Sequence, residues 1–236
     1  MSSIRQHLIL IPGLLCDERL WAHQIRHLGE CAEITVADTL QDDSVGAMAE
    51  RLLAAAPDRF ALAGLSMGGY VALEVMRRAP QRVTKLALLD TSARADSEDQ
   101  TSRRRGLIEL ARKGRFKGVT PRLLPLLIHA DRMQDTDLTQ TVMDMAAAVG
   151  QEAFVRQQTA ILTRPDGRDS LSRITVPTLV VVGRQDALTP PELAGETAEG
   201  IADARLAIIE ECGHLATLER PQATTALLRD WLVYAR

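Results

Sequence analysis

Short apolar runs separated by amphipathic stretches are the feature that most restricts how this chain can fold. Six runs have the length of single strands: 7–11, 33–37, 60–63, 85–89, 178–182 and 205–209. The run 178–182 reads Thr-Leu-Val-Val-Val, and strands buried on both faces of a parallel sheet have such compositions. The pattern predicts the α/β class, with a mostly parallel six-stranded sheet and helices on both of its faces.

Helical periodicity occupies most of the intervals between these runs. The helices expected around the sheet are 17–28, 44–56, 67–79, 190–199 and 222–235. Ser44 has a side chain that commonly caps the amino end of a helix. Pro190 and Pro191 lie where the first turn of a helix tolerates proline.

The interval 93–173 breaks this alternation, because it contains no convincing strand. Helical periodicity recurs there at about 101–113, 119–129, 135–148 and 151–162. A structureless loop of this length would be unusual in a compact domain. We therefore predict a core formed by residues 1–92 and 174–236, and a helical cap insertion formed by residues 93–173, which lies over one end of the sheet.

Composition restricts the partners and the cellular location. The chain has 28 Lys and Arg against 31 Asp and Glu, so it lacks the basic footprint of a nucleic-acid-binding protein. No apolar run approaches the ~20 residues that cross a bilayer. The apolar stretch near the amino terminus ends at Pro12-Gly13, too early for a signal peptide, and the three cysteines have no metal-ligand spacing. We expect a cytoplasmic protein with no membrane or nucleic-acid partner.

Residues 64–68 read Gly-Leu-Ser-Met-Gly and lie between an apolar strand and an expected helix. In that setting the pattern predicts a tight turn that holds Ser66 in a strained backbone conformation at the carboxyl end of the strand. Gly64 and Gly68 leave room for the strand and the helix to approach each other. The backbone N–H of Met67 would then point at a developing oxyanion. The alternative is a tight strand–helix turn in some other α/β fold.

A serine nucleophile needs a base, and the base needs an acid that orients it. His214 follows the last strand, so we expect it at the same sheet edge as Ser66. Asp186 follows the strand 178–182 and is the favoured acid. Asp90 also ends a strand and is a rival; otherwise we expect it to satisfy backbone donors at the start of the insertion.

These segments resemble α/β-hydrolase fold proteins, of the small serine esterase and enol-lactonase-like group. The resemblance covers nearly the whole chain outside the insertion and lies in five stretches: 11–17, 63–69, 183–186, 213–214 and 219–221. It implies the chain order Ser, Asp, His for the catalytic residues. It also implies that the chain begins at what is usually the third strand, which leaves a sheet of six strands.

The resemblance implies a second oxyanion donor in the loop after the first strand. By position this donor is the N–H of Leu14, with Leu15 as the alternative. Many relatives have His-Gly in this loop, where this chain has Pro12-Gly13. The difference removes a side chain but keeps the backbone donor.

A serine at the turn points to an acyl-enzyme, hence to a carboxylesterase-like hydrolase of esters, thioesters or lactones. The alternatives on the same scaffold are a carbon–carbon bond hydrolase and a cofactor-free haloperoxidase. A non-catalytic ligand-binding protein is disfavoured because Ser66, Asp186 and His214 are all present. A base and two oxyanion donors suffice for this chemistry, so we expect neither a metal nor a cofactor.

A cap over Ser66 favours a small or medium acyl group in an enclosed pocket. The candidates for its lining could equally belong to the core: Leu15, Leu123, Leu127, His129, Met143 and Leu188. The expected cap also carries a basic stretch that starts with Arg103-Arg104-Arg105 and includes Arg112, Lys113, Arg115 and Lys117. It could dock an acidic carrier protein or a substrate carboxylate, or be a solvated helix face.

Overall fold

The computed structural model describes residues 5–235. Its six strands are β1 (Gln6–Ile11), β2 (Ala32–Val36), β3 (Phe60–Leu65), β4 (Val83–Leu89), β5 (Thr178–Gly183) and β6 (Ala204–Ile209). They form one sheet in the order β2-β1-β3-β4-β5-β6, and every neighbouring pair is parallel. The predicted six-stranded parallel sheet is therefore confirmed.

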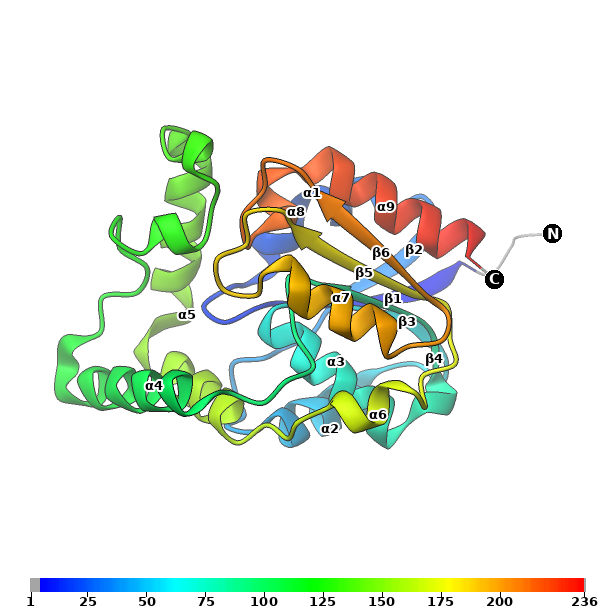
Figure 1. Cartoon of the computed structure of the whole chain (residues 1–236), viewed down its shortest axis with the longest axis horizontal. Coiled ribbons are helices and arrows are strands. Elements are labelled where there is room, and N and C mark those ends of the chain that lie inside the picture. Colours follow the sequence, from blue (N-terminus) through cyan, green and yellow to red (C-terminus); the bar gives the residue numbers. More distant parts are fainter. Residues whose placement is uncertain (1–4, 236) are drawn as a thin grey trace.

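Helices cover both faces of this sheet (Figure 1). One face carries η1 (Glu18–Trp21), α1 (Ala22–Leu28), α8 (Ala216–Glu219) and α9 (Pro221–Tyr234). The other face carries α2 (Val45–Ala55), α3 (Met67–Arg78), α6 (Arg168–Leu171) and α7 (Pro191–Glu199). A short turn, η2 (Pro80–Arg82), leads from α3 into β4.

Strand β1 shows why residues 8–11 are apolar at every position. Leu8 and Leu10 point into the hydrophobic cluster that contains α1 and α9. Ile9 and Ile11 point into the cluster on the opposite face, with α2 and α3. Because successive strand residues face opposite sides and both sides are covered, each position must be apolar.

Two of the residues expected to begin helices around the sheet do so, Ser44 and Pro191. The Ser44 hydroxyl accepts a hydrogen bond from the N–H of Ala47, 3.1 Å away, and caps α2. Pro191 is the first residue of α7, as its missing N–H allows. None of the helices among residues 5–235 combines the length and the apolar character that crossing a bilayer requires.

The part of the chain between β4 and β5 that spans residues 98–162 is mostly helical and lies beyond the carboxyl ends of the strands, on the left in Figure 1. Its elements before the return are α4 (Glu98–Leu110), η3 (Ala111–Arg115), η4 (Leu124–Leu126), η5 (Ala130–Arg132) and α5 (Thr136–Leu162). Helix α5 is interrupted at Gly150, whose φ of 75° and ψ of 176° are not helical. The two helices expected over 135–162 are thus two halves of α5.

The helix expected over 119–129 is wrong. That stretch contains turns and the three-residue 3₁₀ helix η4. Pro121 and Pro125 are spaced four apart and lack N–H donors, and a proline ring clashes with the carbonyl four residues earlier in a helix. Leucine-rich periodicity alone was therefore misleading here.

Hydrogen bonds close the base of this insertion, where the chain leaves the core and returns. The N–H of Gly167 donates to the carbonyl of Ala93 over 2.7 Å. The Arg164 guanidinium donates to the carbonyl of Arg94 at 3.0 and 3.2 Å. It also pairs with the buried Asp96 carboxylate at 2.8 Å. The two connecting segments are therefore held against each other.

Candidate active site

Ser66 lies on the sharp turn between β3 and α3, with φ 55° and ψ −116°. A positive φ is strained for a residue with a side chain and persists only where the surroundings enforce it. A Cβ on Gly64 would lie 2.2 Å from the Gly68 carbonyl oxygen, and one on Gly68 would lie 2.2 Å from the Ile11 carbonyl oxygen. Only glycine fits at these two positions, as the sequence predicted.

Hydrogen bonds on both sides of Ser66 enforce this conformation. Its N–H donates to the carbonyl of Leu89, 2.9 Å away on β4. Its carbonyl accepts from the N–H of Gly69 at 2.9 Å and from the hydroxyl of Thr91 at 2.8 Å. The serine backbone is therefore fixed by β4, by the segment that follows β4 and by its own helix.

The structure brings together the side chains of Ser66, His214 and Asp186, which come from the loops after β3, β6 and β5. Nδ1 of His214 lies 2.8 Å from Oδ2 of Asp186. A proton on Nδ1 that is donated to this carboxylate leaves Nε2 as the acceptor. The Ser66 hydroxyl lies 2.9 Å from Nε2 and can donate to it. The three side chains thus form one hydrogen-bonded series.

The carboxylate of Asp186 is held by its own loop. Oδ1 accepts from the N–H groups of Leu188 and Thr189, each at 2.9 Å, and Oδ2 accepts from the Thr189 hydroxyl at 2.7 Å. Burial raises the pKa of Asp186, but the charge and hydrogen bond of His214 outweigh burial and leave that pKa below its usual range. Asp186 is therefore held as the ionised partner of the imidazole.

Burial lowers the pKa of His214, but the adjacent Asp186 carboxylate outweighs burial and leaves the pKa above its ordinary value. The two partners agree in direction, since each stabilises the charged form of the other. His214 itself is buried, with 4% of its surface exposed. The imidazole is therefore a stronger base than a free histidine.

Asp90, the rival acid, has another role. Its carboxylate accepts from the N–H of Gly183 at 2.9 Å and from the N–H of Ala216 at 3.2 Å. It satisfies backbone donors as expected, but these belong to the last residue of β5 and the first residue of α8 and not to the start of the insertion. Burial and the nearby Asp186 raise the pKa of Asp90 well above its usual range. Asp90 thus joins the two loops that carry Asp186 and His214.

Glu219 was not predicted as a site residue, yet it holds the backbone on both sides of His214. Its buried carboxylate accepts from the N–H groups of Gly213 at 2.9 Å, Leu215 at 3.2 Å and His129 at 2.6 Å. The N–H of His214 donates to the carbonyl of Leu127 at 3.0 Å. The sequence offered Glu219 only within the stretch 219–221 and did not mark it as a buried acid that must find donors.

The loop after β1 lies against Ser66, since a Cβ on Gly13 would be 3.4 Å from the Ser66 Cβ. Within the described part of the chain, the Leu14 N–H donates no hydrogen bond to a protein acceptor. Met67 is the first residue of α3, where a helix leaves N–H groups without intrahelical acceptors. Both donors are therefore free for a ligand.

The Leu15 N–H, the alternative donor, is engaged. It donates to Oε1 of Gln157 over 3.0 Å, and Leu15 has a positive φ of 59°. Nε2 of Gln157 donates in turn to the carbonyl of Thr39 at 3.3 Å. Gln157 comes from α5 and is completely buried, so it fixes the loop next to Leu14. Sequence reasoning did not single out Gln157.

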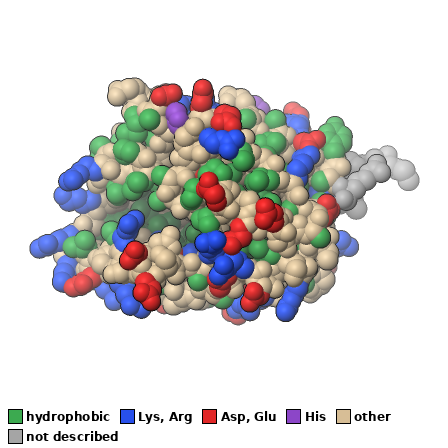
Figure 2. Space-filling view, viewed as in Figure 1, with side chains coloured by type: hydrophobic (Ala, Val, Ile, Leu, Met, Phe, Trp, Pro, Cys, Tyr) green, Lys and Arg blue, Asp and Glu red, His purple; other side chains and the backbone are tan. Residues whose placement is uncertain are grey.

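The residues expected to line a substrate pocket differ in burial. Leu15 is buried among apolar side chains of the insertion, and Leu127, His129 and Met143 are half-buried. Leu123 and Leu188 are exposed, at 42% and 37%. Nδ1 of His129 accepts from the N–H of Asp131 at 3.2 Å, so this ring caps η5. Figure 2 shows a hollow lined by hydrophobic side chains between the insertion and the core.

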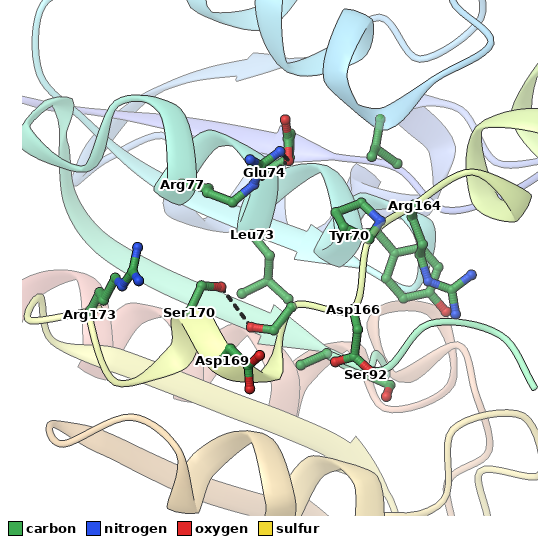
Figure 3. Close-up of a pocket in the computed structure, with 14 residues that line it drawn as sticks. Tyr70, Leu73, Glu74, Arg77, Ser92, Arg164, Asp166, Asp169, Ser170 and Arg173 are labelled. Carbon is green, nitrogen blue, oxygen red and sulfur yellow. Dashed lines mark hydrogen bonds and ion pairs between the residues drawn. The ribbon is translucent and has the colours of Figure 1, made fainter.

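A separate cavity of about 200 Å³ lies at the base of the insertion. In Figure 3 the Arg164 guanidinium stacks on the ring of Tyr70, and acidic and basic side chains alternate around the opening. Its lining comes from α2, α3, the segment after β4 and the return segment 164–173. Ser66, Asp186 and His214 do not line it.

Two of the cysteines are buried thiols with raised pKa values. The three cysteines are free, and burial raises the pKa of the Cys16 thiol to about 12 and that of Cys212 further still. A thiol with such a pKa is a poor nucleophile near neutral pH. Between residues 5 and 235, no cluster of three or more His, Cys, Asp or Glu side chains is placed to hold a metal ion.

Comparison with known proteins gives the same fold. Residues 8–227 match the alpha/beta hydrolase family. The pimeloyl-acyl-carrier-protein methyl ester esterase of Neisseria meningitidis serogroup B is 26% identical over 173 residues, which cover 72% of this chain and 67% of that protein. A thermophilic esterase from Thermogutta terrifontis, solved with malate bound, is 28% identical with a TM-score of 0.87, over 96% of this chain and 89% of that one.

The enol-lactonase from Burkholderia xenovorans LB400 also has a TM-score of 0.87, at 23% identity and over 98% of this chain and 93% of that one. At this identity the likeness concerns the fold alone. The resemblance predicted from the sequence is confirmed, because the family match spans most of the chain and the sheet has the predicted strands. The chain belongs to the alpha/beta hydrolase family.

Proposed function

We propose that this protein hydrolyses a carboxylic ester of a small or medium acyl group through an acyl-enzyme on Ser66. The observation that carries the proposal is the hydrogen-bonded series Ser66, His214 and Asp186 at a strained strand–helix turn. The names of its relatives, which include esterases, support the same reaction class. Thioesters and lactones form the same acyl-enzyme and belong to the proposal.

In the first half-reaction, Oγ of Ser66 attacks the ester carbonyl carbon while Nε2 of His214 accepts the hydroxyl proton. The imidazolium formed in this step is stabilised by the Asp186 carboxylate, 2.8 Å from Nδ1. When the tetrahedral intermediate collapses, the bond to the alcohol oxygen breaks, and His214 returns the proton to that oxygen. The acyl group remains on Ser66 and the alcohol leaves.

In the second half-reaction, water takes the place of the alcohol. His214 accepts a proton from the water, the hydroxide oxygen attacks the acyl carbon, and the carboxylic acid leaves as Ser66 recovers its proton. The oxyanion of both intermediates would be bound by the N–H groups of Leu14 and Met67. Gln157 would contribute by holding the adjoining Leu15 peptide.

The helical insertion, residues 93–173, would act as a cap that limits the size of the acyl group. The hydrophobic hollow between the insertion and the core supports this placement of the substrate (Figure 2). Leu15, Leu127 and Met143 are candidates for contact with the acyl chain, with Leu123, His129 and Leu188 toward the outside. An acidic carrier protein is the proposed partner of the cap.

The test is a panel of 4-nitrophenyl esters from acetate to octanoate, measured with the wild type, Ser66→Ala and the control Ser102→Ala. Ser102 is exposed on α4 and has no side-chain hydrogen bond within the described residues. We expect turnover of the shorter esters and labelling by a fluorophosphonate probe, both lost only in Ser66→Ala. Wild-type protein that hydrolyses no ester and resists the probe would refute the esterase proposal.

The second candidate, a carbon–carbon bond hydrolase, is tested with a vinylogous diketone beside the ester panel. If the diketone is turned over faster than any ester, the proposed function becomes carbon–carbon bond hydrolysis. Bromide-dependent halogenation with no ester turnover would instead support the haloperoxidase. Each of the three activities should be lost in Ser66→Ala if it belongs to this protein, and an activity that persists in this variant comes from a contaminant.

A further inference from the structure

One part of the cap has a charge opposite to that of the rest of the molecule. The stretch 103–122 contains eight arginines and lysines and a single acid, Glu109. The whole chain nevertheless has more acids than bases, 31 against 28. In Figure 2, Lys and Arg side chains gather at the left edge of the molecule, beside the hydrophobic hollow. We call the exposed bases of this stretch the basic face: Arg103, Arg105, Arg112, Lys113, Arg115, Lys117 and Arg122.

The basic face is largely without internal partners. Lys113 pairs with Glu109 at 2.5 Å, but none of the other six makes an ion pair or a side-chain hydrogen bond with a described residue. Many arginines elsewhere on the surface do have a carboxylate: Arg51 binds Asp42 at 2.7 Å and Arg184 binds Glu210 at 2.7 Å. Unpaired cations concentrated on one element attract an acidic surface.

Exposed leucines lie among these charges. Leu107 and Leu110 on α4 are 39% and 45% exposed, and Leu123 and Leu126 after the turn are 42% and 43% exposed. Arg103, Leu107 and Leu110 are spaced four and three residues apart, so they lie along one face of α4. Arginine combined with exposed apolar side chains is the composition of a protein-binding surface.

An anionic membrane could also attract this surface, but one observation favours a protein. Interfacial helices present aromatic residues to the lipid, whereas Phe116, the aromatic residue of this stretch, stacks inward on Phe154 with ring centroids 5.1 Å apart. The inward position of this aromatic ring fits a protein-binding surface better than a lipid-binding one.

We propose that the basic face docks an acidic carrier protein, which delivers the ester into the adjacent hollow on a flexible arm. This inference rests on the proposed esterase function and names the partner of that site. Support comes from the relative of Neisseria meningitidis, whose name specifies an acyl-carrier-protein substrate. In the reaction, water cleaves an ester at the far end of the acyl chain to a carboxylic acid and methanol, and the carrier linkage stays intact.

The experiment compares one acyl chain on two supports. A dicarboxylic acyl chain with a terminal methyl ester is linked either to acyl carrier protein or to free pantetheine. The docking variant is Arg103→Glu/Arg112→Glu/Arg115→Glu. The control variant is Arg26→Glu/Arg59→Glu/Arg173→Glu, which changes three exposed arginines that also lack side-chain hydrogen bonds among the described residues but lie outside the basic face.

We expect the docking variant to lower kcat/KM for the carrier-linked ester on the order of tenfold, with little change for the pantetheine ester. The control variant should leave both values near those of the wild type. For the wild type, added salt should slow hydrolysis of the carrier-linked ester and not of the pantetheine ester, because screening weakens attraction between exposed charges. Equal responses of the two substrates to the variant and to salt would overturn the proposal.

Binding is measured separately from turnover, so that failure of the proposed function can be recognised. Fluorescence anisotropy of labelled acyl carrier protein is recorded against Ser66→Ala with and without the docking substitutions. Binding that the docking substitutions weaken supports the docking face even if no ester is cleaved; no binding refutes it. Sedimentation with phosphatidylglycerol vesicles, without carrier binding, would assign the face to a membrane.

Discussion

The loop around His214 and the stretch 111–122 both lie beyond the carboxyl ends of the strands, yet they are held in opposite ways. In the loop, each N–H from residue 212 to residue 216 donates to the protein, with distances from 2.9 to 3.2 Å. In the other stretch, Gly114 and Gly118 have positive φ, and a Cβ on Gly114 would meet nothing within 4 Å. Every backbone donor is engaged where reacting atoms must align, whereas the stretch 111–122 contains two glycines in the left-handed region.

The acceptors that order the loop are mostly buried carboxylates. Asp90 and Glu219 take backbone donors, while Asp186 takes the imidazole. Burying a polar group is costly unless it is hydrogen bonded, and here several of the donors lie far from the carboxyl group in sequence. The buried carboxyl groups of Asp90, Glu219 and Asp186 therefore connect the loop around His214 to the segments that lie next to it. The following changes test this contrast.

The largest effect is expected for Asp186→Asn, which should lower kcat by roughly 10³- to 10⁴-fold. In the wild type, kcat/KM should fall as the pH drops through the raised pKa of His214, above its ordinary value, because only the neutral imidazole accepts the serine proton. Without the carboxylate, burial remains and lowers the pKa of His214. The fall of kcat/KM on acidification, which is the acid limb of the pH–rate profile, should therefore move to lower pH. A pH–rate profile of both proteins measures the shift.

The control for this change is Thr189→Val, which removes one hydrogen bond to Asp186 and keeps its charge. It should lower the rate far less and move the acid limb only slightly. An acid limb at the same pH in the wild type and in Asp186→Asn would contradict the assigned partner of His214.

Glu219→Gln should have the next largest effect, because an amide cannot accept at both ends from three N–H groups. We expect a loss of about 1–3 kcal/mol in the free energy of unfolding, since a buried donor is left unpaired. The kcat for a small ester should fall by roughly ten- to a hundredfold with KM little changed. Chemical denaturation and steady-state kinetics measure the two quantities.

The matched control is Glu199→Gln, at an exposed position at the end of α7 with no side-chain hydrogen bond in the described chain. It should leave both quantities unchanged. Loss of stability in Glu219→Gln with a normal kcat would show that the loop around His214 keeps its geometry without this carboxylate.

A smaller effect is expected for Gln157→Leu, which leaves the N–H of Leu15 without its acceptor. The loop that carries the proposed oxyanion donor should become less well placed, and kcat should fall about tenfold while ester binding is nearly unchanged. The control Gln151→Leu alters an exposed glutamine of the same helix. If Gln157→Leu has the kcat of the wild type, Gln157 does not contribute to oxyanion binding.

The smallest effect is expected for Gly114→Ala, in the stretch of the basic face. A φ of 71° costs a residue with a Cβ about 1 kcal/mol, but the added methyl group meets no neighbour. The free energy of unfolding should fall by that amount or less, and kcat/KM for a small ester should stay the same. A clear loss of small-ester activity would show that this stretch is coupled to the loop around His214.

The parts of the fold that follow from local chemistry were predictable. The six apolar strand runs and the glycines at 64 and 68 are required by close packing within a few residues. Glu219 and Gln157 were missed because each holds a partner that is distant in sequence: the bond from His129 to Glu219 spans 90 residues and the bond from Leu15 to Gln157 spans 142. No local pattern specifies such a partner. The 119–129 helix failed for the reverse reason, since its prolines were a local signal that leucine periodicity concealed.

The bond from the His214 N–H to the Leu127 carbonyl has a consequence for protein engineering. Cap segments are attractive units for transplantation between homologous scaffolds, on the view that they merely sit above an independent catalytic base. Here a graft that exchanged the whole insertion would also exchange the acceptor that anchors the base itself. Chimeras should therefore keep residues 127–132 of the recipient and join foreign sequence upstream of Leu127.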